Sequence, residues 1–418
     1  MFPVVLASVI FFSILGVLIA SQLYWFRQGR RRVHKLPRVW QRWALGVPLY
    51  AWFILLLAVF VLVPFRWMNL HNAPVLLSVF MVLRSPVLMI PLSLWLAASL
   101  FAFLFIQMVR GGGWVIARLT SLRASGRPDG VSVERRYFLQ NATRVAGAIP
   151  FVMVGYGFVR SRGFYVVEEV TVPIPNLPPP LDGLRLLQLT DVHASAFMPV
   201  EEIRHVAAMA HELKAGLVFH TGDTLTSRGD PLPEAIAELS QIQGAHGGFG
   251  CLGNHEIYAG VTDTATRLFA ERGVRLLRNQ NAELEINGAR VNLIGVDYQR
   301  QPRGLEPESW KPYFLRGVEK LVRPDALNIL LTHNPNPFLR AADLGIQLTL
   351  AGHTHGGQVQ VEILDNRWSP ARFITPFISG LYERNSSHLY VSRGVGTIAM
   401  PVRLNAPAEI SLLTLRRA

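Results

Sequence analysis

The N-terminal third of this chain contains long apolar runs, and these constrain its fold more than any other feature. A helix needs about 20 predominantly apolar residues to cross the hydrocarbon core of a bilayer. Runs of that kind recur through the first 110 residues, and a weaker one follows. We predict four membrane-spanning helices, at 3–25, 43–65, 86–109 and 145–160.

The apolar run at 75–109 is too long for one perpendicular helix, and it is interrupted by Arg-Ser-Pro at 84–86. We therefore place the crossing at 86–109 and interpret 75–83 as a half-helix or interfacial lead-in. A fifth crossing there would put one of the two basic segments of the chain on the outer side of the membrane, against the usual distribution of charge.

Positive charge gathers between the apolar runs and predicts their orientation. Segment 27–42 carries seven Lys and Arg residues and no acid, and segment 110–144 carries seven Arg residues. Segment 66–73 carries one basic residue. Because short loops rich in Lys and Arg stay cytoplasmic, we predict an integral protein of the bacterial inner (cytoplasmic) membrane. Everything after about residue 161 would then be extracytoplasmic.

Segment 132–140 resembles a twin-arginine export signal. Arg135 and Arg136 precede Phe138 and Leu139, and a mildly apolar stretch follows. Such a signal would carry the following domain across the membrane after folding. Alternatively, the two arginines at the start of a helix are anchors that keep this end in the cytoplasm. Both interpretations place the following domain on the same side of the membrane.

Charge and cysteine content exclude two classes of protein. The net charge is +13, yet residues 1–160 hold 17 Lys and Arg against two acids, whereas 161–418 hold 24 against 26. The positive charge belongs to the membrane region, and no nucleic-acid partner is expected, because such binders carry their basic patch on the folded domain. One cysteine, Cys251, allows neither an internal disulfide nor a cysteine-rich zinc site.

Residues 161–418 alternate between short apolar strands and amphipathic helices. Strand-like segments such as FYVVEEVTVPI, LRLLQLT and GLVFHT are interleaved with helical patterns such as PVEEIRHVAAMAHELKA and LPEAIAELSQI. The later part is richer in strands and contains a hairpin turn at Asn287 and Gly288. This order predicts a mixed α/β sandwich in one domain.

Most candidate ligands lie where an apolar strand ends. Five strand ends lead into Asp191 and His193, Asp223, Asn254 and His255, His333, and His353 and His355. In α/β folds ligands gather at the carboxyl ends of strands. Side chains two residues apart on an extended chain project to the same face, so Asp191 with His193, and His353 with His355, can each hold one site.

The chemistry of these donors constrains the ion. Imidazole, carboxylate and amide oxygen without thiolate suit Mn, Fe, Zn or Co. These donors are more than one tetrahedral ion needs. We therefore predict two divalent metal ions that share a bridging carboxylate, bridge a hydroxide and neutralise phosphate oxygens. Glycines at 222, 253, 352, 356 and 357 permit close approach of the backbone to a phosphate.

The ordered series TDVH, GD, GNHE, THNP and GHTHGGQ resembles the calcineurin-like metallophosphoesterase superfamily. GHTHGGQ followed by LYVSRGVG and a PxR segment resembles its membrane-anchored bacterial branch. The resemblance covers about 183–415. It implies a four-layer β-sandwich flanked by helices (α/β, or α+β), placed after an α-helical transmembrane region. It also implies a hydrolase acting on ester or anhydride bonds of phosphate, through a metal-bridging hydroxide.

The resemblance implies a role for each matched residue. Asp191, His193 and His355 would hold the first metal, Asn254, His333 and His353 the second, and Asp223 would bridge both. His255 would be the catalytic residue, steadying the transition state or protonating the leaving oxygen as a general acid. Glu256 would orient a neighbouring ligand.

Other residues are interpreted more simply. Ordinary structural roles are expected for His205, His211, His220, His246 and His388, for Cys251, and for the turn residues Asp230 and Asp297. Arg393 and Arg403 either contact substrate phosphate or form surface ion pairs. The aromatic stretch 373–382 packs as a loop, faces the bilayer or lines a substrate groove.

The expected partners are the membrane and a phosphate-containing small molecule or lipid. Anchoring beside the bilayer favours a lipid-linked or envelope phosphate, as a mono- or diester or a pyrophosphate. A nucleotide-linked glycolipid pyrophosphate would need the domain on the cytoplasmic side.

Two alternatives are a two-metal amidohydrolase or peptidase, which would use more bridging carboxylates, and a membrane sensor or transporter that binds metal without turnover. The latter predicts charges within the membrane, where only Arg84 qualifies. The sequence leaves the substrate, the native metals and the oligomeric state open.

Overall fold

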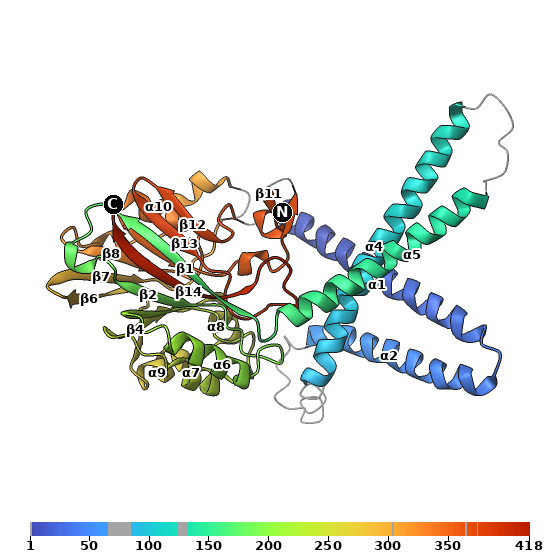
Figure 1. Ribbon diagram of the computed structural model, residues 1–418, viewed down its shortest axis with the longest axis horizontal. Coiled ribbons are helices and arrows are strands. Elements are labelled where there is room, and N and C mark those ends of the chain that lie inside the picture. The colour runs from blue at the N-terminus through green and yellow to red at the C-terminus, as the bar shows by residue number, and fades with distance from the viewer. Residues whose placement is uncertain (1, 66–84, 124–132, 303–304, 364–365, 374) are drawn as a thin grey trace. The chain divides into compact units, whose positions relative to one another are not determined.

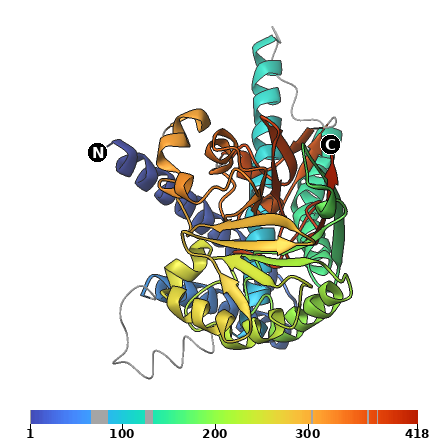
Figure 2. The same ribbon diagram turned by 90° about the vertical axis from the view of Figure 1, so that its left-hand side faces the viewer.

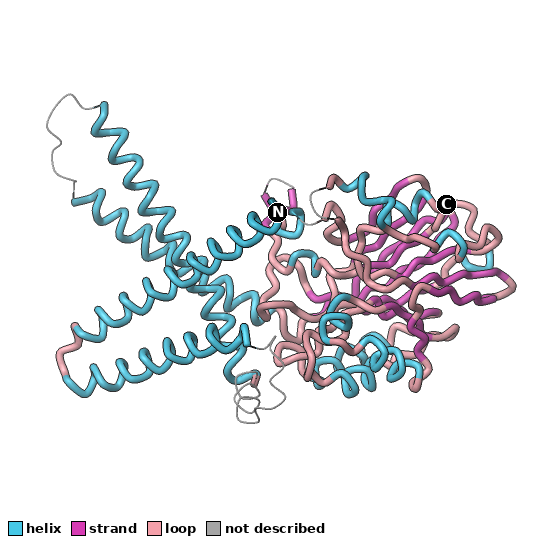
Figure 3. Tube along the Cα trace, turned by 180° about the vertical axis from the view of Figure 1, so that it is seen from behind, coloured by secondary structure: helices cyan, strands magenta, loops and turns pink. Residues whose placement is uncertain are grey.

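The computed structural model describes residues 2–65, 85–123, 133–302, 305–363, 366–373 and 375–418. The chain divides into two compact units, Met1–Tyr156 and Gly157–Ala418. Figure 3 shows that the first unit is helical, whereas the strands belong to the second unit. The predicted lead-in at 75–83 and Arg84 lie outside the described residues.

The first unit is built from long helices that contain the four predicted crossings. These are α1 (Phe2–His34), α2 (Val39–Phe65), α4 (Pro86–Arg123) and α5 (Val133–Arg160), the last of which runs into the second unit. Among the described residues, three helical stretches are long and apolar enough to cross a membrane, at Val39–Val59, Pro86–Ile116 and Arg136–Arg160. The chain is a membrane protein by this measure.

The two basic segments differ from the sequence prediction, which interpreted 27–42 and 110–144 as loops. Residues up to His34 continue α1 and residues from Val39 begin α2, so only four residues connect the two helices. In the second segment, α4 extends to Arg123 and α5 begins at Val133. Arg is a good helix former, and continuing the helix keeps backbone polar groups paired at the membrane edge.

A small polar cluster joins α1 to α4. Ser21 Oγ and Trp25 Nε1 both donate to the carbonyl of Ser99, at 3.1 and 2.8 Å. Gln22 Nε2 donates to Ser99 Oγ at 3.0 Å, and Gln22 Oε1 accepts from Trp95 Nε1 at 2.9 Å. Hydrogen bonds of this kind stabilise helix contacts inside a bilayer, where water cannot satisfy the same groups.

The second unit contains two six-stranded sheets and a two-stranded hairpin. The first sheet has the order β1-β14-β2-β3-β4-β5, with bounds Tyr165–Ile174, Ala408–Arg417, Arg185–Leu189, Leu217–Thr221, Gly248–Cys251 and Val274–Leu276. Strands β2 to β5 are parallel to one another. The last strand of the chain, β14, lies between β1 and β2 and pairs with both. The beginning and the end of the second unit therefore belong to the same sheet.

The second sheet has the order β12-β13-β9-β8-β7-β6, with bounds Gly380–Arg384, Ser387–Val391, Leu348–Ala351, Leu327–Leu331, Ala289–Gly295 and Gln280–Ile286. The hairpin is β10 (Val361–Ile363) with β11 (Asn366–Trp368). The predicted turn between β6 and β7 is present, because Asn287 and Gly288 both have positive φ, at 51° and 82°. This is the geometry of a two-residue type I′ hairpin.

The two sheets pack face to face, and apolar side chains from both form a shared buried core. Figure 2 shows the strands of this unit from the side. Phe219 and Phe249 from the first sheet meet Leu293, Ile329 and Leu350 from the second, and all are buried. Figure 1 shows helices below the first sheet and α10 (Phe338–Asp343) above the second. The helices below are α6 (Val200–His211), α7 (Leu232–Leu239) and α9 (Thr262–Ala270). The predicted sandwich flanked by helices is confirmed.

The sequence prediction missed the short elements. Residues Asn254–Ala259 form helix α8, directly after the strand end predicted before Asn254. Short 3-10 helices occupy Pro179–Leu181, Pro307–Tyr313, Val318–Lys320, His355–Gly357 and Pro370–Phe373. These elements have only one or two turns, so their apolar period is too short to read from the sequence.

Candidate metal centre

Strand ends from both sheets meet at one edge of the sandwich. In the first sheet the Asp191 N–H donates to the carbonyl of Gly222 at 3.0 Å, which aligns the segments after β2 and β3. In the second sheet the Gly352 N–H donates to the carbonyl of His333 at 3.1 Å. The Asp191 carboxylate then accepts from the backbone N–H of His353 at 2.9 Å, which links the two sheets.

One group of possible metal ligands consists of Asp191, His193 and His355, all buried. His193 Nε2 lies 3.0 Å from His355 Nε2. Asp191 Oδ1 lies 3.3 Å from His355 Nε2 and 3.9 Å from His193 Nε2. The two imidazoles thus present nitrogen atoms, and the carboxylate an oxygen, to one point.

A second group consists of Asp223, His333 and His353. His333 Nε2 lies 3.0 Å from Asp223 Oδ2 and 3.1 Å from His353 Nδ1. The same Asp223 Oδ2 lies 3.6 Å from Nε2 of His193 in the first group. One carboxylate oxygen therefore faces both groups, as a bridging ligand must.

Each of the two carboxylates has one oxygen held by the protein and the other directed at imidazoles. Asp191 Oδ2 accepts from Thr190 Oγ1 at 2.8 Å, while Oδ1 faces the first group. Asp223 Oδ1 accepts from the backbone N–H of His255 at 2.8 Å, while Oδ2 faces His333. Both carboxylates are thereby oriented before any ligand binds.

Backbone carbonyls set the tautomers of two histidines. His333 Nδ1 lies 2.8 Å from the carbonyl of Thr221, and His255 Nδ1 lies 2.6 Å from the carbonyl of Thr226. A carbonyl only accepts, so both Nδ1 atoms carry protons and donate. His333 Nε2 is then left with a lone pair for a metal, and His255 Nε2 is left for other partners.

Helix α8 begins at Asn254 and presents the next two residues to the site from a short capped turn. Glu256 accepts from the backbone N–H groups of Gly253, Asp223 and Thr224, at 2.9, 3.1 and 2.6 Å. It thereby ties the end of β4 to the end of β3. His255 is half-buried, and its ring centroid lies 4.7 Å from that of His193.

The backbone around the site is unusually strained. Asp191, His193, Asp223, His353 and His355 all have positive φ, between 50° and 74°. Such conformations cost about 1–3 kcal/mol each and persist at functional sites where the surroundings enforce them. Among the predicted glycines, a Cβ on Gly253 would overlap the Asp223 carboxylate, and one on Gly352 would overlap that of Asp191. Only glycine fits at these two positions.

The histidines have opposite pKa shifts. Burial lowers the pKa of His193 to about 3 and that of His353 to about 4. Burial also opposes the charge on His333, but the carboxylates of Asp223 and Asp191 raise its pKa to about 10. The pKa of Asp223 is lowered, because His333 and His193 outweigh the effect of burial. A proton on His333 and a metal cation would each balance the negative charge of these carboxylates, so the two compete.

The residues fit a pair of divalent ions. Ligand atoms that surround one ion at about 2.1 Å lie about 3.0–3.4 Å from each other, and most of the spacings within the two groups fall in or near that range. The buried Asn254 Oδ1 has no hydrogen-bond partner among the described residues, as expected of an amide oxygen that serves as a ligand. The donor set contains no thiolate, which favours borderline and hard metals.

The other histidines remain outside these groups in the part of the chain that the structure describes. His220 is buried against Phe269, with ring centroids 5.3 Å apart, and His388 lies 4.0 Å from Glu383. Asp297 pairs with Arg278 at 3.2 Å, and Asp230 accepts from the N–H of Ser227 at 2.6 Å. Cys251 is buried in β4.

Neither expectation for Arg403 holds. Its side chain is 1% exposed and donates to the carbonyls of Arg393, Gly394, Gly396 and Ala406. No carboxylate pairs with it among the described residues, so it contacts neither solvent nor a surface acid. The buried carbonyls of the surrounding loop need hydrogen-bond donors, and the guanidinium supplies them because it has five N–H groups.

Arg393 does form ion pairs, but they are largely buried rather than on the surface. It contacts Glu168 at 2.6 Å and Glu409 at 2.7 Å, and its side chain is 14% exposed. In the aromatic stretch, Phe377 packs against Phe338 and Tyr382, with ring centroids 5.7 and 5.2 Å apart. The described part of that stretch is therefore packed against the domain, and it ends in strand β12.

Several residues at the site were missed from the sequence. Tyr298 follows β7 and lies with its ring centroid 5.4 Å from that of His353. Tyr258 lies on α8, 5.8 Å from the ring of His255. Thr226 contacts both His193 and His255. Tyr298 could have been found as one more polar side chain at a strand end, whereas the other two lie in segments without periodicity.

Comparison with known proteins identifies the family of this chain. The sequence profile of the family described as Calcineurin-like phosphoesterase matches residues 184–357. The Bacillus subtilis uncharacterised metallophosphoesterase YkuE is 29% identical over 297 residues, covering 68% of this chain and 98% of YkuE. The Danio rerio transmembrane protein with metallophosphoesterase domain is 30% identical, covering 72% of this chain and 68% of its own length. An uncharacterised Aquifex aeolicus metallophosphoesterase is 30% identical, covering 60% and 92%.

The chain belongs to the calcineurin-like phosphoesterase family and is a hydrolase. The matched region contains all six residues of the two groups. The resemblance inferred from the ordered motifs is confirmed.

Proposed function

We propose that this protein is a membrane-anchored, two-metal phosphoesterase that hydrolyses phosphate mono- or diesters or pyrophosphates, on lipid-linked or other envelope phosphates. The observation that carries this proposal is the place of Asp223 Oδ2, 3.0 Å from His333 Nε2 and 3.6 Å from His193 Nε2. An oxygen shared between two sets of donors suits a pair of ions about 3.5–4 Å apart.

The residues divide into two ligand sets. Asp191, His193 and His355 would hold one ion, Asn254, His333 and His353 the other, and Asp223 both. Divalent ions bound there would supply a hydroxide nucleophile at neutral pH and charge neutralisation for phosphate oxygens. Manganese is one candidate among the metals that this donor set suits.

His255 would act on the substrate rather than on a metal. Its Nδ1 is committed to the Thr226 carbonyl at 2.6 Å, so the ring orientation is fixed and Nε2 is the atom available to the substrate. In the protonated form, Nε2 donates to a phosphate oxygen and delivers its proton to the leaving oxygen. Glu256 holds the backbone N–H groups of Gly253 and Asp223 and would take no part in proton transfer.

The protein would lie in the bacterial inner membrane, with its catalytic unit on the extracytoplasmic side. Support comes from the basic segments 27–42 and 110–144, which favour the cytoplasmic side. Arg135 and Arg136 would act as a twin-arginine signal or as an anchor at the start of α5. The domain division would be a membrane region, 1–160, followed by the phosphoesterase domain, 161–418. Paired alkaline phosphatase and fluorescent-protein fusions after Ala418 test the side directly.

The enzyme assay uses the full chain in detergent, loaded with Mn²⁺ and supplied with mono- and bis-aryl phosphates. Asp223→Asn should abolish hydrolysis with the fold retained, because the neutral amide cannot balance two cations. Unchanged turnover in that variant would remove the bridging role of Asp223. A wild-type protein that binds metal but hydrolyses none of these esters would instead support a binding domain without turnover.

A further inference from the structure

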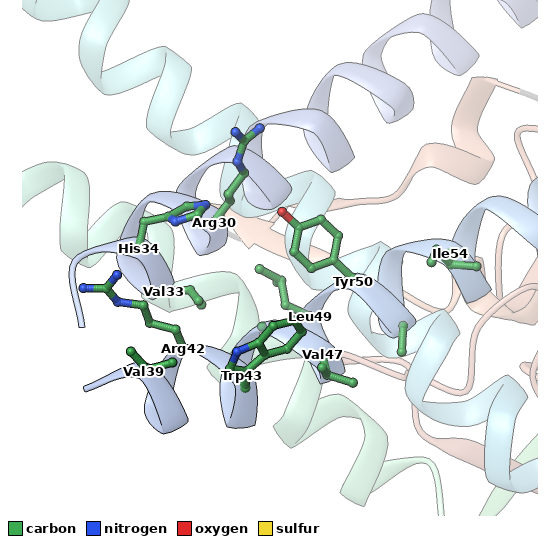
Figure 4. A pocket seen from close by; sticks show the side chains of 12 residues that line it. Arg30, Val33, His34, Val39, Arg42, Trp43, Val47, Leu49, Tyr50 and Ile54 are labelled. Carbon is green, nitrogen blue, oxygen red and sulfur yellow. The ribbon is translucent and has the colours of Figure 1, made fainter. Parts of the chain in front are cut away.

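A pocket of about 680 Å³ lies in the first unit, between the end of α1 and the start of α2. Its lining combines three basic side chains, Arg30, His34 and Arg42, with an apolar body. Figure 4 shows the basic side chains toward one end and Ile54 at the other. The volume is that of a small-molecule site rather than of a packing defect.

The two helices approach closely beside this pocket. A Cβ on Gly29 would lie 2.9 Å from Leu49 Cδ1, and one on Gly46 would lie 3.6 Å from Val33 Cγ1. Small residues at these positions allow the backbones to come together. The pocket therefore lies beside a defined contact between the two helices.

Within the part of the chain that the structure describes, the basic end has no internal counter-charge. No carboxylate there pairs with Arg30, His34 or Arg42, and all three side chains are exposed. Arg42 Nε donates a hydrogen bond to the carbonyl of Leu36 at 2.8 Å, which keeps the side chain at the turn between the helices. Three basic groups that share one pocket without an acid suit an anion such as a phosphate.

The apolar body continues from the basic end along one face of α2. Val39, Trp43, Val47, Tyr50 and Ile54 recur at helical spacing, and each is an exposed side chain that lines the pocket. From Arg42 to Ile54 the helix rises about 18 Å, which is close to the depth of one bilayer leaflet, about 15 Å. Trp43 and Tyr50 are residue types that favour the membrane interface.

We propose that this pocket binds one anionic phospholipid. The headgroup phosphate would lie between Arg30, His34 and Arg42, and an acyl chain would lie along Val47 and Ile54. Charge complementarity selects an anionic lipid, and the length of the apolar stripe selects a chain that reaches into the leaflet. The pocket contains none of the phosphoesterase residues, so the bound lipid is a resident of the membrane unit and not a substrate.

The test measures lipid binding by native mass spectrometry of the full chain in neutral detergent, titrated with phosphatidylglycerol. Phosphatidylcholine with the same chains tests the charge, and glycerol 3-phosphate tests whether the headgroup alone suffices. We expect one phosphatidylglycerol per chain, bound more tightly than phosphatidylcholine, and no binding of glycerol 3-phosphate at the same concentration. Equal binding of both lipids, or tight binding of glycerol 3-phosphate, would overturn the proposal.

A pair of charge-matched variants separates the pocket from general attraction to an anionic surface. Arg30→Gln/Arg42→Gln removes two charges from the pocket, and Arg31→Gln/Arg32→Gln removes two from the same helical segment outside it. Because Arg30 and Arg42 line the pocket, the first variant should bind phosphatidylglycerol about tenfold or more weakly, and the second should bind it about as tightly as the wild type. Equal losses in both variants would overturn the proposal.

Ala51→Phe provides a test that leaves the charge unchanged. Ala51 lines the apolar part of the pocket, and a phenyl ring there would occupy the space of the acyl chain. We expect this variant to lose phosphatidylglycerol binding while it hydrolyses aryl phosphates at the wild-type rate, which reports an intact fold. Wild-type lipid affinity in Ala51→Phe would contradict the placement of the chain.

Discussion

The Nδ1 atom of His333 donates a hydrogen bond to the backbone carbonyl of Thr221 at 2.8 Å. His333 follows β8 of the second sheet, and Thr221 ends β3 of the first. This bond crosses between the sheets and leaves Nε2 of His333 facing Asp223 at 3.0 Å. The packing of the two sheets therefore determines which nitrogen of the imidazole is available to a metal.

His333→Ala should empty one of the two metal positions. It removes a nitrogen donor from the group that contains Asp223 and His353 while the other group stays complete. We expect the metal content to fall from about two ions to one per chain and hydrolysis to fall by at least about 100-fold. Elemental analysis after dialysis, with an aryl phosphate assay, measures both. His211→Ala, at the exposed end of α6, is the control and should match wild type. Two ions retained in His333→Ala would exclude His333 as a ligand.

Arg403→Met should lower both stability and metal affinity. Its guanidinium donates to Arg393, Gly394 and Ala406, each at 2.9 Å, and the substitution leaves these carbonyls buried without donors. The loss of several such bonds costs about 3 kcal/mol, or roughly 10 °C in Tm. Metal affinity should fall as well, because the Gly396 N–H in this loop donates to the carbonyl of Asp191 at 2.8 Å.

The matched control for this experiment is Arg416→Gln. Arg416 has a side chain 55% exposed and a long ion pair with Asp182, at 3.7 Å. Surface pairs of this kind contribute about 0–1 kcal/mol, so thermal unfolding should change little. If Arg403→Met unfolds at the wild-type temperature and retains its metals, the loop does not depend on this guanidinium.

His220 should make the fold sensitive to acid. Burial lowers its pKa from 6.5 to about 4, and its Nε2 has no partner among the described residues. The unfolded chain therefore takes up a proton as the pH falls below 6.5, whereas the folded chain does not until about pH 4. The stability is fully present above pH 6.5 and is lost across that window, by at most about 3 kcal/mol.

His220→Phe removes this titration while it keeps an aromatic ring against Phe269. The fall in Tm between pH 7 and pH 5 should be smaller in the variant than in wild type. His193, His353 and His355 also have lowered pKa values, but they are common to both proteins and cancel in the comparison. Parallel curves of Tm against pH would show that His220 is accessible to protons in the folded state.

The sequence predicted the sandwich because strand and helix periods are regular there, and it predicted the ligands because they follow strand ends in a fixed order. It could not predict that Glu256 would accept three backbone N–H groups, since those donors come from loops that meet only in the folded chain. For the same reason Arg403 was misinterpreted. Its partners are backbone carbonyls, which every residue type carries, so the sequence does not reveal them.

Helix ends were also beyond sequence patterns. The basic residues after 25 were assigned to a loop because apolar character stops there, yet α1 continues to His34. Hydropathy reports the part of a helix that lies in hydrocarbon, whereas backbone hydrogen bonds and good helix formers extend it further. The pocket between α1 and α2 exists only because of that extension, so it could not be inferred from the crossings alone.

Tyr298→Ala should lower kcat/KM for aryl phosphates without loss of bound metal. The Tyr298 ring lies 5.4 Å from that of His353 and 6.1 Å from that of His333, so it borders the proposed second ion. It is half-buried, and its hydroxyl has a pKa raised to about 12, first by burial, so it stays neutral beside a phosphate. An aromatic contact contributes about 0.5–1.5 kcal/mol, which predicts a fall in kcat/KM of about threefold to tenfold for aryl phosphates. Tyr313→Ala, an exposed residue of the Pro307–Tyr313 segment, is the matched control. Equal kcat/KM values in the two variants would show that Tyr298 does not face the substrate.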